Sequence, residues 1–261
     1  MANYSTHSFP SSRIATIDVC AIGKQRHHIC ILLECDVTES RFKIRRRKSE
    51  GCKISFTAWL LKVISKTLKE HDEAAAFLLS KKEVIVFDDI NISLLVEKSL
   101  DGKKVPMPLV IEKADKKNAE NITREIEQAK KEVLSDKSVV LNRKSSKSER
   151  LYYHLPSYIR RMFWKIILKH PQIAYNKMGN VAVTSVGMFG QIKGWFIHTT
   201  IHPISFGVGS VIKKPVVVNN DILIREILNL TVLIDHDVID GAPMIRFIND
   251  LVNNIEKGEE L

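Results

Sequence analysis

The sequence is poor in glycine, proline and long apolar runs. Gly (11) and Pro (8) are few among 261 residues, which excludes a collagen-like or low-complexity chain. No apolar run approaches the roughly 20 residues that a membrane-spanning helix needs. The first residues also lack a basic segment followed by an apolar stretch, so we expect no secretory signal and a cytoplasmic protein.

Cysteine is scarce as well. The four cysteines, at positions 20, 30, 35 and 52, include no C-x-x-C pair, and this favours free thiols over a disulfide framework. The histidine groups His27–His28 and His198…His202 have no clustered carboxylate or cysteine that would complete a metal site. We therefore expect no bound metal.

What the chain does contain is typical of a globular protein with a basic surface. Hydrophobic residues make up 44% and charged residues 27%, which is enough for a substantial core. The net charge of +10 suggests an anionic partner, and composition leaves open nucleic acid, an anionic membrane surface or a phosphate-bearing small molecule. The basic run Arg45–Lys48 has no nucleic-acid-binding signature beside it, so we interpret it as a charged helix face.

Hydrophobic periodicity predicts helices and strands that alternate irregularly. Ser55 opens an amphipathic helix, and the last helix has Pro243 in its first turn and Gly258 just beyond its end. This irregular order favours a mixed sheet covered by helices over a doubly wound parallel sheet. We expect residues 1–12 to be a flexible arm and 13–261 to be one domain. Strands are expected at 29–37, 84–87, 90–96, 105–111, 181–186, 204–211, 216–218 and 228–234, and further helices at 119–134 and 151–170.

The segment 135–175 differs from its surroundings. Residues 135–150 have the composition of a linker, and 151–170 form a basic helix that is rich in Tyr, Phe and Trp. We favour a packing element that covers the sheet or lines a subunit interface. The alternative is an interfacial helix that binds an anionic membrane or an acyl carrier, because Arg and Lys alternate there with bulky apolar residues.

The most specific feature lies between the last predicted strand and the last predicted helix. The apolar run 230–234 ends in the sequence Asp235-His236-Asp237-Val238-Ile239-Asp240-Gly241. A histidine at the end of a buried strand can accept a proton near neutral pH, and a nearby carboxylate can fix its tautomer. From these residues alone, a charged surface turn is slightly the better interpretation.

The same segment resembles the D-H-R-x-x-D-G-A signature of the dihydrolipoyl acyltransferase catalytic domain, the core subunit of 2-oxo acid dehydrogenase complexes. Residues 183–190 are similar to the family's T-I-S-N-L-G-M-F-G. Further family segments match in order, so that the resemblance covers about residues 13–134 and 176–258. It implies the α/β (α+β) fold of chloramphenicol acetyltransferase: a mixed sheet flanked by helices in a single domain, with the segment at about 135–175 as an insert.

This resemblance implies an acyltransferase that moves an acyl group between CoA and a dihydrolipoyl-type thiol or another acceptor. His236 matches the family's general base, and Asp240 matches the aspartate that holds the active-site loop. Thr184 falls on the serine that donates to the oxyanion, with Ser185 as the alternative register and Gly187 as a further substrate-side residue. Active sites of this family lie between subunits, which implies a homotrimer or a multiple of trimers.

Two positions depart from the family pattern. Asp237 replaces an arginine and places a carboxylate beside His236, which would favour the protonated imidazole. Thr184 keeps the serine hydroxyl but adds a methyl group. We also expect no lipoyl attachment site in this chain, so a lipoyl group would come from another protein. A catalytically inactive scaffold of the same fold, or a basic module that binds a membrane or an acyl carrier, therefore remains an alternative.

Overall fold

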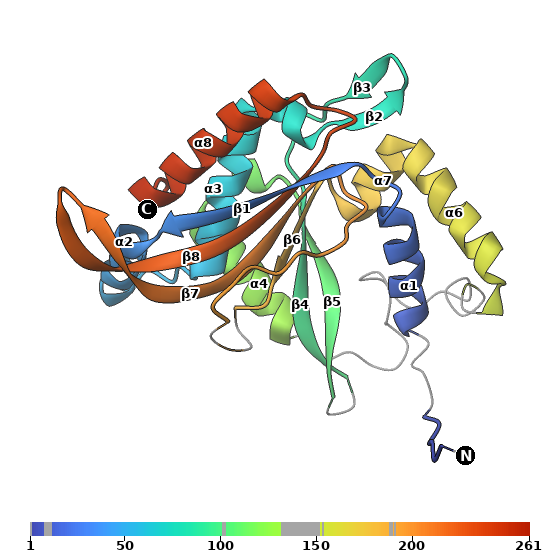
Figure 1. Ribbon diagram of the computed structural model, residues 1–261, viewed down its shortest axis with the longest axis horizontal. Coiled ribbons are helices and arrows are strands. Elements are labelled where there is room, and N and C mark those ends of the chain that lie inside the picture. Colours follow the sequence, from blue (N-terminus) through green and yellow to red (C-terminus); the bar gives the residue numbers. More distant parts are fainter. Residues whose placement is uncertain are drawn as a thin grey trace.

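The sheet organises the molecule. A computed structural model of the protein describes residues 2–7, 12–100, 103–131, 152, 154–187, 190 and 192–261. Six strands form one mixed sheet in the order β1-β8-β7-β6-β4-β5 (Figure 1). Its strands are β1 (His28–Asp36), β4 (Ile92–Leu100), β5 (Lys103–Ile111), β6 (Val181–Ser185), β7 (Ile204–Val218) and β8 (Asp221–Asp235), while β2 (Phe77–Ser80) and β3 (Glu83–Ile85) pair separately.

The strand directions confirm the expected mixed sheet. β6 runs parallel to both β4 and β7, whereas β1–β8, β7–β8 and β4–β5 are antiparallel pairs. The helices are α1 (Ser12–Gly23), α2 (Thr38–Ser49), α3 (Phe56–Glu70), α4 (Ala119–Lys131), α6 (Ser157–Lys169), α7 (Pro171–Met178) and α8 (Gly241–Lys257), with short 3₁₀ turns at Asp72–Ala75 and Ala114–Lys116. A mixed sheet flanked by helices in a single domain was the fold that the sequence predicted.

The core lies between the sheet and helices α3, α4 and α8. Trp59 and Leu60 of α3 are buried there with Phe206 of β7 and Phe247 of α8. The Ser55 hydroxyl caps α3 by accepting a hydrogen bond from the backbone N–H of Ala58, at 3.2 Å. The predicted amphipathic helix therefore begins where the sequence placed its start.

The β7–β8 hairpin is longer than the sequence predicted. Its turn residues Asn219 and Asn220 both have positive φ, which is the geometry of a tight two-residue hairpin turn. The strands predicted at 204–211 and 216–218 are one strand, with a bulge between Val208 and Val211. The outer half of the hairpin is largely exposed on both faces, so its apolar pattern was a weak signal.

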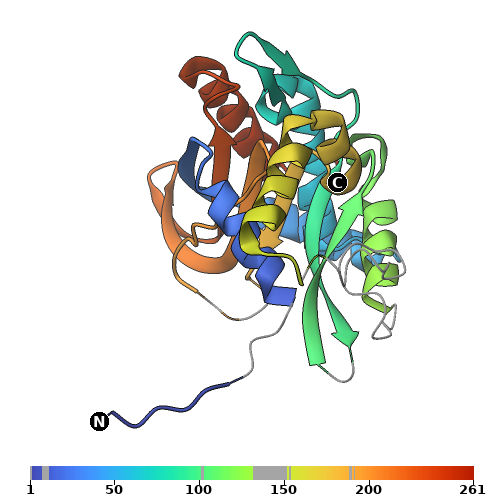
Figure 2. The same cartoon turned by 90° about the vertical axis from the view of Figure 1, so that its right-hand side faces the viewer.

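Three helices gather at the end of the molecule shown on the right of Figure 1. They are α1, α6 and α7, and Figure 2 shows α6 beside α1. Of these, α6 falls within the helix predicted at 151–170, whereas α1 and α7 were not predicted. Much of the segment 135–175, including the linker-like part at 135–150, lies outside the described residues.

Other sequence expectations can be placed on this fold. The basic run Arg45–Lys48 lies on α2, where Arg45 approaches Glu226 at 3.4 Å and Arg46 pairs with Glu50 at 3.1 Å. Within the described ranges, no three His, Cys, Asp or Glu side chains cluster as metal ligands. In the same part of the chain, no helix has the length and apolar character needed to cross a membrane.

Candidate active site

His236 is held by its backbone while its side chain is exposed. It follows β8 directly, and its N–H donates to the carbonyl of His27 at 3.0 Å. The preceding Asp235 is almost fully buried, and its carboxylate pairs with the Arg26 guanidinium at 3.1 Å. The same carboxylate accepts the N–H of Asp237 at 3.2 Å. The connection between α1 and β1 therefore fixes the turn that presents His236.

Asp237 turns toward His27. The Nδ1 of His27 lies 2.9 and 3.0 Å from the two carboxylate oxygens of Asp237. This hydrogen bond and the charge of Asp237 raise the pKa of His27. The carboxylate that replaces the family's arginine thus has a hydrogen-bond partner of its own beside His236.

Asp240 occupies the start of α8. It has the extended backbone of an N-cap residue, and its carbonyl accepts the N–H of Met244 at 3.1 Å. Its exposed side chain makes no capping hydrogen bond. Between His236 and Asp240, Ile239 is buried and anchors the loop to the core.

Thr184 lies on β6, on the sheet face opposite the core helices. Its neighbours Val181 and Val183 are buried on the helix side, so alternation places Thr184 on the other face. The register pairs Thr184 with Gly207, and Gly207 in turn with Thr231 of β8. The hydroxyl of Thr231 is buried without a hydrogen-bond partner in the described residues.

Thr184 and His236 are far apart within one chain. His236 lies five positions beyond Thr231, and Thr231 is two strands away from Thr184. At about 3.3 Å per residue and about 4.8 Å per strand, the two Cα atoms are roughly 19 Å apart. A single chain does not bring the two predicted groups to one reacting centre.

The other two predicted substrate-side residues follow Thr184. Ser185 is half-buried and lies opposite Val208 of β7. A Cβ on Gly187 would stand 2.4 Å from the Gly209 carbonyl oxygen, so only glycine allows the chain to pass this close to β7. The structure thus gives Gly187 a backbone reason to be glycine.

A buried polar cluster beside Thr184 was not predicted as part of the site. His198 lies over Gly207, and its Nε2 is 2.6 Å from the hydroxyl of Ser205. Burial lowers the pKa of His198 to about 4, with a smaller contribution from His28, so the ring is neutral. The spacing of His198 and His202 suggested at most a metal site, and no sequence pattern linked either histidine to the strand of Thr184.

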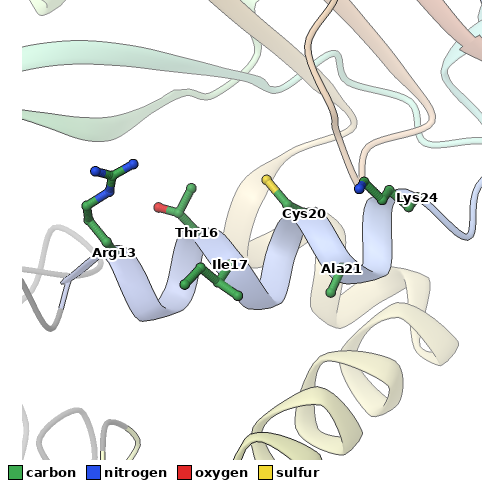
Figure 3. Close-up of a pocket in the computed structure, with 6 residues that line it drawn as sticks. All are labelled: Arg13, Thr16, Ile17, Cys20, Ala21 and Lys24. Carbon is green, nitrogen blue, oxygen red and sulfur yellow. The ribbon is translucent and has the colours of Figure 1, made fainter. Parts of the chain in front are cut away.

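The two hollows described on the molecule include neither His236 nor Thr184. One, of about 400 Å³, lies along an outer face of α1 (Figure 3) and is lined by Arg13, Thr16, Ile17, Cys20, Ala21 and Lys24. The other lies between the end of α3 and the start of α8 and includes Ile239 and Pro243. His236 itself is exposed in the single chain.

Comparison with known proteins found a matching family model and several similar sequences. Residues 24–140 and 169–261 match the family model of the 2-oxoacid dehydrogenases acyltransferase (catalytic domain). The unmatched residues 141–168 lie inside the segment 135–175. The lipoamide acyltransferase component of the branched-chain alpha-keto acid dehydrogenase complex of Bacillus subtilis (strain 168) is 26% identical over 239 residues, covering 89% of this chain and 47% of that protein. The chain spans about half the length of such curated relatives.

Two solved structures have the same fold. A probable dihydrolipoamide acetyltransferase from Listeria monocytogenes 4b F2365 superimposes with a TM-score of 0.68 at 23% identity, over 99% of this chain and 97% of that one. A chloramphenicol acetyltransferase superimposes with a TM-score of 0.51 at 11% identity, over 96% of this chain and 95% of that one. The chloramphenicol acetyltransferase-like fold expected from the sequence is confirmed.

Proposed function

The chain belongs to the 2-oxoacid dehydrogenases acyltransferase (catalytic domain) family, and from that premise we propose that it transfers an acyl group between CoA and a thiol of the dihydrolipoyl type. The observation that carries the proposal is the geometry of His236. Its backbone is fixed through His27 and the Arg26–Asp235 pair, while its side chain is exposed to solvent and so accessible to a thiol.

His236 acts as the general base in this proposal. An imidazole nitrogen removes the proton from the acceptor thiol, and the resulting thiolate attacks the carbonyl carbon of the acyl thioester. The new C–S bond gives a tetrahedral oxyanion. Collapse of this intermediate breaks the original C–S bond, and the leaving thiolate takes the proton back from the imidazolium.

Thr184 is proposed as the donor to the oxyanion. Its half-buried hydroxyl lies at a strand position, so the sheet can hold it in one orientation. A fixed donor directed at the developing charge lowers the barrier more than mobile water does. The basic surface of the chain suits the phosphates of CoA.

We propose that the complete site forms between two chains. The separation of roughly 19 Å between His236 and Thr184 leaves each group without the other inside one subunit. A homotrimer, or a multiple of trimers, would place His236 of one subunit beside Thr184 of the next. A lipoyl-bearing domain would then present the acceptor thiol to this site.

The test is acyl transfer from acyl-CoA to a panel of thiol, amine and hydroxyl acceptors. We expect turnover with a dithiol acceptor and a fall in kcat of about 10²- to 10⁴-fold for His236→Ala. His7→Ala is the matched control, because His7 is another exposed histidine and belongs to the N-terminal segment. Equal turnover by His236→Ala and the wild type would contradict the mechanism, and no turnover with any acceptor would favour the inactive scaffold.

A further inference from the structure

The inner side of α6 is committed to packing on α1. Asp18 of α1 is completely buried, and Arg160 donates to its carboxylate at 2.6 Å. The Tyr152 hydroxyl donates to the same carboxylate at 3.0 Å, and Trp164 Nε1 donates to the Tyr152 oxygen at 2.9 Å. These contacts fix which side of α6 faces the protein.

The opposite side of α6 exposes an apolar row. Tyr158, Met162 and Ile166 recur every four residues, so they lie one above another on the helix. Their exposed fractions are 71%, 56% and 46%, and the neighbouring Phe163 is 52% exposed. No described residue buries this row. Contiguous exposed apolar side chains of this size mark an interaction surface.

A cationic row runs beside the apolar one. Arg161, Lys165 and Lys169 also recur every four residues, each three positions after a member of the apolar row. Residues 152–178 contain no Asp or Glu. Among the described residues, Lys165 and Lys169 form no ion pair, and Arg161 reaches only the Asp18 carboxylate, at 3.8 Å. The charges of Lys165 and Lys169 are therefore available to a partner.

We propose that the two rows of α6 bind an anionic lipid surface. The apolar row would enter the boundary between headgroups and acyl chains, and the cationic row would contact lipid phosphates. Figure 1 shows α6 at the outer edge of the molecule with α1 on its inner side, and in Figure 2, where this side faces the viewer, the two helices lie side by side. A flat surface can thus contact both rows over the length of the helix.

Charge and shape favour this partner over the others. A second copy docking through the same face would place one cationic row against another. A soluble polyanion would bind the cationic row but leave the apolar row in water. A lipid surface is the partner that supplies both a negative charge and an apolar layer along one plane.

The proposal can be tested with the full chain and large unilamellar vesicles. We expect co-sedimentation with mixed phosphatidylcholine–phosphatidylglycerol vesicles, little with phosphatidylcholine alone, and release by high salt. Lys165→Ala/Lys169→Ala should weaken binding roughly 30-fold, because each cation near the membrane contributes about fivefold. Met162→Gln/Ile166→Gln should weaken binding to a similar extent.

Two control variants make the same chemical changes elsewhere. Lys81→Ala/Lys82→Ala removes two exposed cations from the β2–β3 turn, and Ile222→Gln/Ile224→Gln changes two apolar side chains that are more exposed than Met162 and Ile166. Both controls should keep wild-type binding. The proposal is overturned by absence of wild-type binding at low salt, or by equal losses in the control variants. It is also overturned if Met162→Gln/Ile166→Gln reduces the oligomer size in light scattering without changing vesicle binding, since α6 would then be a subunit contact.

Discussion

Asp237 stands where the family has an arginine, beside the proposed base His236, and its carboxylate is not left without a partner. The Asp237 carboxylate is hydrogen-bonded to His27, and no hydrogen bond joins this carboxylate to His236 in the described structure. His27 belongs to the same α1–β1 connection whose carbonyl holds the backbone of His236. The carboxylate is thereby balanced by a cation at low pH, and this balance depends on the charge of His27.

The His27–Asp237 pair predicts a pH dependence. Because the pKa of His27 is raised from 6.5 in the folded protein, the pair's contribution to stability is complete below about pH 6.5. It is lost as the pH rises through the raised pKa. NMR titration should show the His27 pKa returning toward 6.5 in Asp237→Asn, which should also lose this part of the pH dependence of unfolding. An unchanged His27 titration in that variant would refute the pairing.

Thr184 permits a second test at single-residue scale. Thr184→Val keeps the shape of the side chain but removes the hydroxyl, so kcat should fall about 10²- to 10³-fold while the fold is retained. Thr184→Ser restores the donor and should keep kcat within roughly tenfold of the wild type. Steady-state kinetics with acyl-CoA separate the outcomes. Equal losses in both variants would point to packing rather than to oxyanion stabilisation.

The sequence could identify candidate residues of this site, but not the residues that hold them in place. His236 and Thr184 stand in recognisable motifs, so the sequence alone makes them candidates. Arg26 could not be found in this way, because its partner Asp235 lies 209 positions away. His198 was interpreted as an ordinary histidine, since its position over Gly207 depends on how an irregular segment folds back on the sheet.

At the scale of the elements, the hydrophobic pattern of the sequence predicted the helices and strands that pack in the main core. The apolar stripe of α3 was visible because most of that helix is buried, and β7 and β8 were visible as apolar runs because their inner halves are buried at nearly every position. The helix α1 packs on α6, and α7 packs on α6 and on the short strand β2, so their apolar residues do not face the main core. The aromatic character of α6 was visible, but its attachment to Asp18 was not.

The ion pair between Arg160 of α6 and Asp18 of α1 predicts that removing Arg160 lowers the stability of α6. Arg160→Ala leaves Asp18 buried without its closest cation, which should lower the free energy of unfolding by about 3 kcal/mol. Hydrogen exchange should accelerate in residues 157–169. The matched control is Arg161→Ala, since Arg161 is half exposed and 3.8 Å from the same carboxylate; it should cost less than about 1 kcal/mol. Equal effects of the two variants in urea unfolding would contradict this account of the packing.

At the scale of the whole molecule, the two groups of the proposed site lie apart within one chain. β8 carries His236 past the end of the sheet, while β6 holds Thr184 well inside it. Neither described hollow joins them. The sequence predicted a site shared between subunits only through the family resemblance. The distance between Thr184 and His236 depends on the register of β6, β7 and β8, which no local sequence pattern reveals.

Mixing two inactive variants tests whether the site is shared between chains. In an assembly of His236→Ala and Thr184→Val chains, a shared site is intact when the first chain supplies Thr184 and the second supplies His236. Random co-assembly at equal amounts should therefore restore about a quarter of the wild-type sites, although each variant alone is at least about 100-fold slower than the wild type. The chains are unfolded together, refolded, and assayed for acyl transfer, with light scattering to confirm oligomers of wild-type size. If mixed oligomers form and activity stays at the level of the separate variants, each site belongs to one chain and the shared arrangement is wrong.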